Sequence, residues 1–144
     1  MKKRLLTVSI AESCTGGLAA DIVTNKPGSS SYFKGGLVAY SNASKTDILK
    51  VPKGTLTKYG AVSPQVSSSM AKNVRRVFGT DIGVGITGIC GPSGGSKAKP
   101  VGLVYISIAA KGAIKTKKFR FKGTRRAIKL ESARAALKLI NDII

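Results

Sequence analysis

Apolar residues along the chain occur in two patterns, as short continuous runs and as repeats with helical spacing. A short apolar run bounded by turn residues is typical of a buried strand, and an apolar repeat every three to four residues is typical of one helix face. The runs predict strands over 5–10, 33–40, 81–86, 101–109 and 114–121. The repeats predict helices over 15–23, 42–49, 65–78 and 124–144. Strands that alternate with helices predict a layered α/β domain.

Turn and capping residues support several of these boundaries. Ser63 is a suitable helix N-cap, and Pro64 suits the first position of the helix that follows. Pro52 and Gly54 separate the short second helix from the segment after it. The strand over 114–121 alternates apolar and basic side chains, which predicts an edge strand or one half exposed to solvent.

The charge of the chain is strongly positive, with 25 Lys and Arg against 6 Asp and Glu and a formal net charge of +19. Such an excess attracts nucleic acids, phosphorylated metabolites and acidic membrane surfaces. The basic residues are scattered, however, and there is no Trp, so no aromatic stacking platform for RNA is indicated. We therefore favour a solvated basic surface whose nucleic-acid binding is at most weak and non-specific.

Length and composition limit the remaining classes. The 144 residues contain no repeat and no low-complexity linker, so we expect one domain over residues 1–144. No apolar segment approaches the ~20 residues of a membrane span, and the first ten residues lack the apolar centre of a secretory signal. We expect a cytoplasmic protein with no membrane partner. Cys14 and Cys90 match no metal-ligand spacing and the chain has no His, so we expect buried thiols and no metal site.

Candidate chemistry concentrates in three turn-forming segments, 12–17, 40–45 and 87–95, each of which follows a predicted strand. In an open α/β sheet the carboxyl ends of the strands form the ligand crevice, so these segments are expected to meet in one pocket. The 87–95 loop resembles a phosphate-binding loop in composition. It lacks the Gly-Lys-Ser/Thr ending of a Walker A motif, so an ATPase is not indicated.

Ser13 is the candidate nucleophile, because it stands where a strand gives way to a glycine-bearing turn. A Ser-His-Asp triad is excluded in a chain without His, so a Lys or Tyr must accept the serine proton. Lys45 follows Tyr40 by five residues, and burial or neighbouring cations would lower its pKa towards that of a base. The backbone N–H groups of the turn over 15–17 are candidates for holding an oxyanion or a phosphate.

Five segments in the same order resemble the CinA C-terminal domain family. They are Ala11-Glu12-Ser13-Cys14-Thr15-Gly16-Gly17, Val38-Ala39-Tyr40-Ser41-Asn42 with Lys45, Gly60-Ala61-Val62-Ser63, Thr87-Gly88 with Gly91-Pro92 and Gly94-Gly95, and Lys99-Pro100-Val101-Gly102. The resemblance implies a three-layer α/β/α sandwich with a mixed central sheet of about five strands. It also implies a nicotinamide-nucleotide amidohydrolase, which converts nicotinamide mononucleotide to nicotinic acid mononucleotide and ammonia without a metal or cofactor.

The resemblance also assigns roles to single residues. Ser13 corresponds to the nucleophile of the family, Lys45 to its base, and Tyr40 to the tyrosine of the same motif. The expected substrate-binding residues are Thr15, Gly16, Gly17, Thr87, Gly88, Gly91 and Arg125. The expected partners are a small mononucleotide substrate and a second copy of the chain in a homodimer. The alternative is a non-catalytic module that binds nucleotides or nucleic acid through a degenerate pocket.

Overall fold

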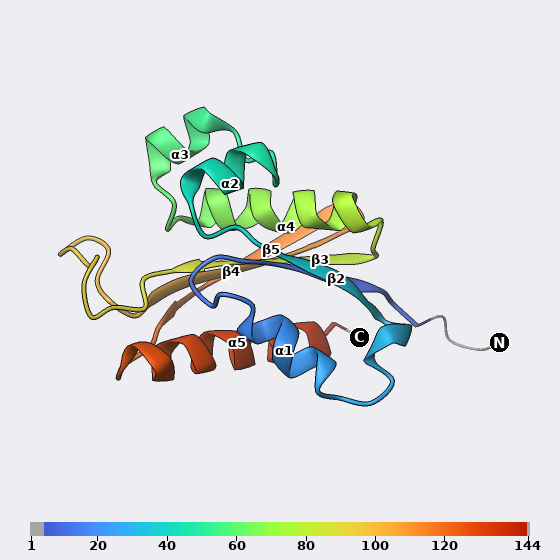
Figure 1. Cartoon of the computed structure of the whole chain (residues 1–144). Coiled ribbons are helices and arrows are strands. Elements are labelled where there is room, and N and C mark those ends of the chain that lie inside the picture. The colour runs from blue at the N-terminus through green and yellow to red at the C-terminus, as the bar shows by residue number, and fades with distance from the viewer. Residues whose placement is uncertain (1–4, 144) are drawn as a thin grey trace.

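Five strands form one mixed sheet in the computed structural model, which describes residues 5–143 (Figure 1). The strands are β1 (Val8–Glu12), β2 (Phe33–Val38), β3 (Ile82–Gly88), β4 (Leu103–Ala110) and β5 (Ala113–Arg120). They lie in the order β2-β1-β3-β4-β5. β1 pairs in parallel with β2 and β3, whereas β4 is antiparallel to both of its neighbours.

Helices cover both faces of this sheet, which gives three layers (Figure 1). On one face lie α1 (Leu18–Thr24) and α5 (Arg125–Asn141). On the other lie α2 (Asn42–Asp47), α3 (Lys53–Tyr59) and α4 (Pro64–Phe78), and a short 3-10 turn, η1 (Ser29–Ser31), precedes β2. The expected α/β/α sandwich with a mixed five-stranded sheet is confirmed. No helix within residues 5–143 is both long and apolar enough to cross a membrane.

The first strand and the first helix begin later than predicted. The strand starts at Val8 and continues to Glu12, and the helix starts at Leu18. Gly16 and Gly17 have φ angles of 60° and 103°, so the backbone before Leu18 is a left-handed turn instead of a helical one. The predicted helix boundary was wrong because apolar spacing does not reveal a turn of this kind.

Two further boundaries differ from the sequence prediction. The segment after Pro52 forms the helix α3, with Pro52 as its N-cap residue and Gly54 inside the helix. Pro52 therefore both separates α2 from the next segment and begins a new helix there; proline is common at the start of a helix. The last helix ends at Asn141, and the predicted end at Ile144 lies outside the described residues.

The two faces of the sheet have different packing. Val8, Ile10 and the apolar residues of β3 pack against α1 and α5. The opposite face of β3 carries Gly83 and Gly85, and α4 lies directly on them, because a Cβ on Gly83 would fall 2.1 Å from the Ala71 carbonyl oxygen. The Ser67 hydroxyl of α4 donates to the Gly85 carbonyl at 3.0 Å. These glycines therefore set how closely α4 approaches the sheet.

β5 is an edge strand, as its alternating sequence predicted. Lys115, Lys117, Lys118 and Arg120 are all exposed along it. Charged side chains on an edge strand disfavour pairing with the edge of another sheet. A large part of the positive charge in the second half of the chain therefore lies on this solvated edge.

We expect Gly85→Ala to destabilise the domain. Its Cβ would lie 2.3 Å from the Ser67 carbonyl oxygen and 2.7 Å from the Ala71 nitrogen, both backbone atoms that move only with α4. Overpacking of this kind costs about 1–3 kcal/mol, measurable as a lower urea midpoint. Gly54→Ala in α3 is the matched control, because no atom lies within 4 Å of its added Cβ. Equal midpoints for the two variants would contradict the close approach of α4.

Candidate active site

The carboxyl ends of three neighbouring strands open into a cavity of about 260 Å³. Glu12, the last residue of β1, pairs with Val38 of β2 and Ile86 of β3, so these strands end close to the same level. The turn after β1, the segment after β2 and the loop after β3 therefore begin side by side. Of the predicted site residues, Ser13, Tyr40, Lys45, Thr87, Gly88, Gly91 and Arg125 line the cavity.

Glu12 fixes the turn that carries the candidate nucleophile. Its side chain is 1% exposed. The carboxylate accepts hydrogen bonds from the backbone N–H groups of Gly17 (3.1 Å), Ala19 (3.0 Å) and Ala20 (2.8 Å). These donors at the start of α1 have no partner inside the helix, and a negative charge is favourable at this end of the helix dipole. Strand β1 is therefore tied directly to α1, and the turn between them is held at both ends.

The sequence analysis assigned no role to Glu12. The available signal was an acidic residue at the end of a buried apolar run, immediately before a turn and a helix start. A carboxylate in that position can cap the helix across the intervening turn.

Three other predicted substrate-binding residues, Thr15, Gly16 and Gly17, do not line this cavity. The Gly16 N–H donates to the Ser13 carbonyl at 3.1 Å, and the Gly17 N–H donates to Glu12. Among the described residues of this turn, the N–H groups of Cys14 and Thr15 donate to no backbone carbonyl, and of these two residues Cys14 lines the cavity. The Cys14 N–H is therefore a better candidate for an oxyanion donor than the Gly16 N–H.

Ser13 lies directly beyond β1, and its N–H donates to the Ile86 carbonyl at 3.0 Å. This bond continues the β1–β3 pairing by one residue and places the serine at the bottom of the cavity, where β1 and β3 end. The side chain is 7% exposed and lines the cavity together with Lys45. Among the described residues, no hydrogen bond joins Ser13 and Lys45 directly, so proton transfer between them would require a bridging molecule in the cavity or a closer approach of the two side chains.

Lys45 is buried by the geometry of α2. Ser41 and Ser44 form a reciprocal capping box, with bonds of 3.0 Å and 3.1 Å, which starts the helix at Asn42. Lys45 lies one turn into the helix and is 2% exposed. Its Nζ donates to the Tyr40 carbonyl at 3.4 Å. Burial lowers the pKa of this amine below its ordinary value of 10.5, while the neighbouring Cys14 raises it by a smaller amount.

Arg125 joins two of the segments around the cavity to the start of α5. Thr124 caps α5 through a bond from the Ala127 N–H at 3.2 Å, which sets Arg125 at the first helical position. The guanidinium donates to the Gly91 carbonyl at 2.6 Å and to the Tyr40 hydroxyl at 2.8 Å. Tyr40 is 59% exposed, so this bridge lies at the mouth of the cavity.

Thr87 holds a fourth segment against the site. Its hydroxyl donates to the Ala61 carbonyl at 2.8 Å. Ala61 and Val62 line the cavity as a result, although the sequence analysis treated their segment only as part of a resemblance. The Lys99 amine donates to the Tyr59 carbonyl and so fastens the long loop after β3 to the end of α3.

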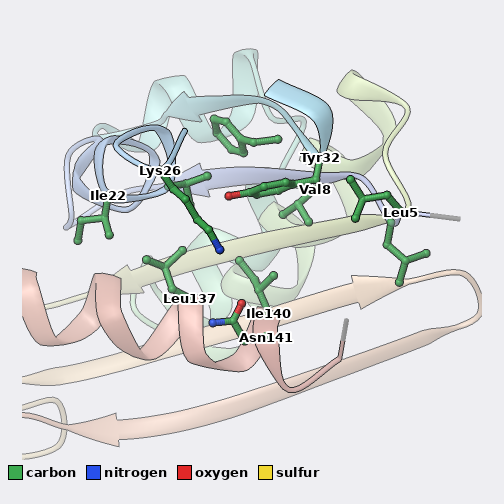
Figure 2. Close-up of a pocket in the computed structure, with 11 residues that line it drawn as sticks. Leu5, Val8, Ile22, Lys26, Tyr32, Leu137, Ile140 and Asn141 are labelled. Carbon is green, nitrogen blue, oxygen red and sulfur yellow. The ribbon is translucent and has the colours of Figure 1, made fainter. Parts of the chain in front are cut away.

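A second cavity, of about 400 Å³, lies at the other end of β1 (Figure 2). Its lining is mostly apolar and comes from the residues just before and at the start of β1, from α1, from the start of β2 and from the end of α5, with Val8, Ile22 and Ile140 among the side chains drawn. Lys26 and Asn141 point towards each other across it (Figure 2). Among residues 5–143, no serine or cysteine lines this cavity. The cavity at the strand ends is therefore the candidate active site.

The sequence matches the family profile of the CinA C-terminal domain over residues 1–144. The chain belongs to the CinA C-terminal domain family. The fold agrees with solved members. A competence/damage inducible protein from Agrobacterium tumefaciens superposes with a TM-score of 0.93 at 42% identity, covering 95% of this chain and 84% of that one. A CinA superfamily protein from Escherichia coli superposes with a TM-score of 0.92 at 30% identity, covering 96% and 81%.

Relatives with longer chains share the same domain. A protein of Moorella thermoacetica named as a competence-damage inducible protein is 54% identical over 137 residues, which are 95% of this chain and 33% of that protein. A CinA-like protein of Dictyoglomus thermophilum is 49% identical over 140 residues, or 97% of this chain and 34% of that protein. The CinA C-terminal domain described here thus spans about a third of the length of these relatives.

We expect Glu12→Gln to destabilise the domain by about 2–4 kcal/mol, because it turns an amide N–H₂ towards backbone donors and leaves buried N–H groups unpaired. Chemical denaturation measures the change. Asp21→Asn is the matched control: it makes the same chemical change on an exposed position of α1, where an effect within about 0.5 kcal/mol is expected. Equal losses in the two variants would show that Glu12 does not organise the turn.

We expect Lys45→Met to raise the free energy of unfolding at neutral pH. Below its lowered pKa, Lys45 carries a charge in a buried place in the folded state and in water in the unfolded state. As the pH rises from that pKa towards 10.5, the unfolded state binds more protons than the folded state, so the wild type becomes more stable. The difference in unfolding free energy between Lys45→Met and the wild type therefore becomes smaller.

Urea unfolding at several pH values measures this gap. Lys72→Met on the exposed side of α4 is the control, with an expected change within about 0.5 kcal/mol at every pH. A gap for Lys45→Met that does not depend on pH would contradict the account of its burial.

Proposed function

We propose that this domain hydrolyses the carboxamide of nicotinamide mononucleotide to nicotinic acid mononucleotide and ammonia. Ser13 is the nucleophile and Lys45 the base. The observation that carries the proposal is the buried Lys45 amine, whose pKa is lowered by burial and which shares a cavity with Ser13. A chain without His needs another proton acceptor beside its serine, and a desolvated lysine is a suitable one.

In the first step, the Ser13 hydroxyl attacks the carboxamide carbon while Lys45 accepts its proton. The negative charge that develops on the carbonyl oxygen is stabilised by the N–H group of Cys14, which lines the cavity and donates to no backbone carbonyl among the described residues. The carbon–nitrogen bond then breaks, and ammonia leaves with the proton that Lys45 returns. Water attacks the resulting ester with Lys45 again as the base, and the acid product is released with Ser13 restored.

Residues at the mouth of the cavity bind the part of the substrate that lies outside it. A volume of about 260 Å³ suits the pyridine carboxamide, so the ribose phosphate extends outwards past Tyr40 and Arg125. Arg125 is suited to a phosphate, because a guanidinium presents several donors in one plane. The start of α1 is not available for this purpose, since the Glu12 carboxylate occupies it. The net charge of +19 also favours encounter with an anionic substrate.

We expect Ser13→Ala and Lys45→Arg each to lower kcat for ammonia release from nicotinamide mononucleotide by about 10³-fold or more, because loss of a general base alone costs about 10²–10⁴-fold. Wild-type kcat/KM should rise with pH and level off at the pKa of Lys45, below 10.5. Lys53→Arg, an exposed lysine of α3, is the matched control and should retain wild-type turnover. Turnover that persists in either site variant removes that residue from the mechanism, and a wild type without ammonia release refutes the proposed activity.

A further inference from the structure

Two cysteines that are distant in sequence meet in the wall of the candidate active site. Cys14 follows β1 and Cys90 follows β3; both line the cavity, and they are only 8% and 4% exposed. The Cys90 thiol donates to the Cys14 carbonyl oxygen at 3.7 Å, so the two residues are in direct contact across the wall of the cavity. Both cysteines are free, and the hydrolysis proposed above uses neither thiol.

The surroundings make the two thiols unequal. The neighbouring Cys14 thiol lowers the pKa of Cys90; burial opposes this, and the positive charges of Arg125 and Lys129 lower the pKa further. The neighbouring Cys90 thiol and burial raise the pKa of Cys14. Lys129 reaches this region from α5, since a Cβ on Gly16 would lie 3.7 Å from its amine. Cys90 is thus the thiol more ready to react as a thiolate, and Cys14 is the protonated thiol beside it.

We propose that Cys14 and Cys90 form a reversible disulfide when the protein meets a peroxide, and that this disulfide disables the active site. The proposal rests on the contact of the Cys90 thiol with the backbone of Cys14, on the place of both residues in the wall of a cavity that a small oxidant can enter, and on the two cations beside Cys90. Its first part, disulfide formation, is independent of the proposed hydrolysis.

The chemistry balances with hydrogen peroxide as the oxidant. The Cys90 thiolate attacks one peroxide oxygen, the O–O bond breaks, and the departing hydroxide takes up a proton to become water. The Cys90 sulfenic acid is then attacked by the Cys14 sulfur: an S–S bond forms, the S–O bond breaks, and the second water leaves with the Cys14 proton. Two thiols and one peroxide thereby give one disulfide and two waters. An added dithiol reverses the oxidation.

The disulfide would reshape the site because each cysteine adjoins a residue of the cavity. A covalent bond brings two sulfurs to about 2 Å, closer than any non-bonded contact. Cys14 moves with Ser13, and Cys90 moves with Gly91, whose carbonyl accepts from Arg125. A displacement of about 1 Å at a reacting group can cost about 10²-fold in rate. We therefore expect the oxidised protein to lose at least about tenfold in hydrolysis.

The first experiment treats purified wild type, Cys14→Ala and Cys90→Ala with hydrogen peroxide, followed by intact mass, thiol titration and non-reducing peptide mapping. We expect the mass of the wild type to fall by two hydrogen atoms and both free thiols to disappear. The peptide that contains Cys14 should be linked to the peptide that contains Cys90 within one chain. In Cys14→Ala, Cys90 should accumulate as a sulfenic acid that dimedone captures, whereas Cys14 in Cys90→Ala should react much more slowly. Retention of both thiols, a link between two chains, or further oxidation of Cys90 beside a free Cys14 would overturn the proposal.

The second experiment compares ammonia release before and after peroxide within each protein. We expect peroxide to lower the rate of ammonia release by the wild type and dithiothreitol to restore it. In Cys90→Ala, the rate after peroxide divided by the rate before it should stay near one. A disulfide that forms without loss of rate would refute the effect on the site. An untreated wild type without ammonia release would refute the proposed function instead, and the mass and thiol measurements would still decide whether the disulfide forms.

Discussion

The site depends on the bond between the Glu12 carboxylate and the start of α1. A strand that ends in a buried acid, Glu12, and a helix that begins at Leu18 are joined through three backbone N–H groups. Burial removes the carboxylate from water, and the hydrogen bonds from these donors offset the lost hydration. The turn between strand and helix therefore has little freedom to move. Ser13 is the first residue of that turn, so its position follows from a contact in which its own side chain takes no part.

The other half of the site is placed by packing on the opposite face of the sheet. Gly83 and Gly85 allow α4 to lie against β3 with backbone in contact with backbone. The α2–α3 segment that precedes α4 is held over the strand ends by Ser63, which caps α4, and by Thr87 of β3, which bonds to Ala61. Lys45 is carried inwards on α2. The close contact of one helix with the sheet and the capping of another therefore bring a hydroxyl and an amine to one cavity.

Much of the fold was visible in the sequence, because apolar runs and helical repeats record which faces are buried. The strands, the edge character of β5, the long helices and the meeting of Ser13, Lys45 and Arg125 around one cavity were predicted. The role of Glu12, the helix α3 and the contact between Cys14 and Cys90 were not. The contact between Cys14 and Cys90 joins residues far apart in sequence, which no local pattern encodes. The acid before α1 and the proline before α3 are local signals, but each fits several structures. The same holds for Gly16 and Gly17, whose left-handed backbone forms the turn before α1.

The central claim is that burial holds Lys45 as an amine able to take a proton from Ser13. The most direct test is an NMR titration of protein labelled with ¹³C-lysine, with the Lys45 signal assigned as the one missing from Lys45→Arg. The account predicts that this signal titrates below the ordinary lysine value of 10.5. A titration at that ordinary value would show that burial does not favour the neutral amine, and would contradict the account.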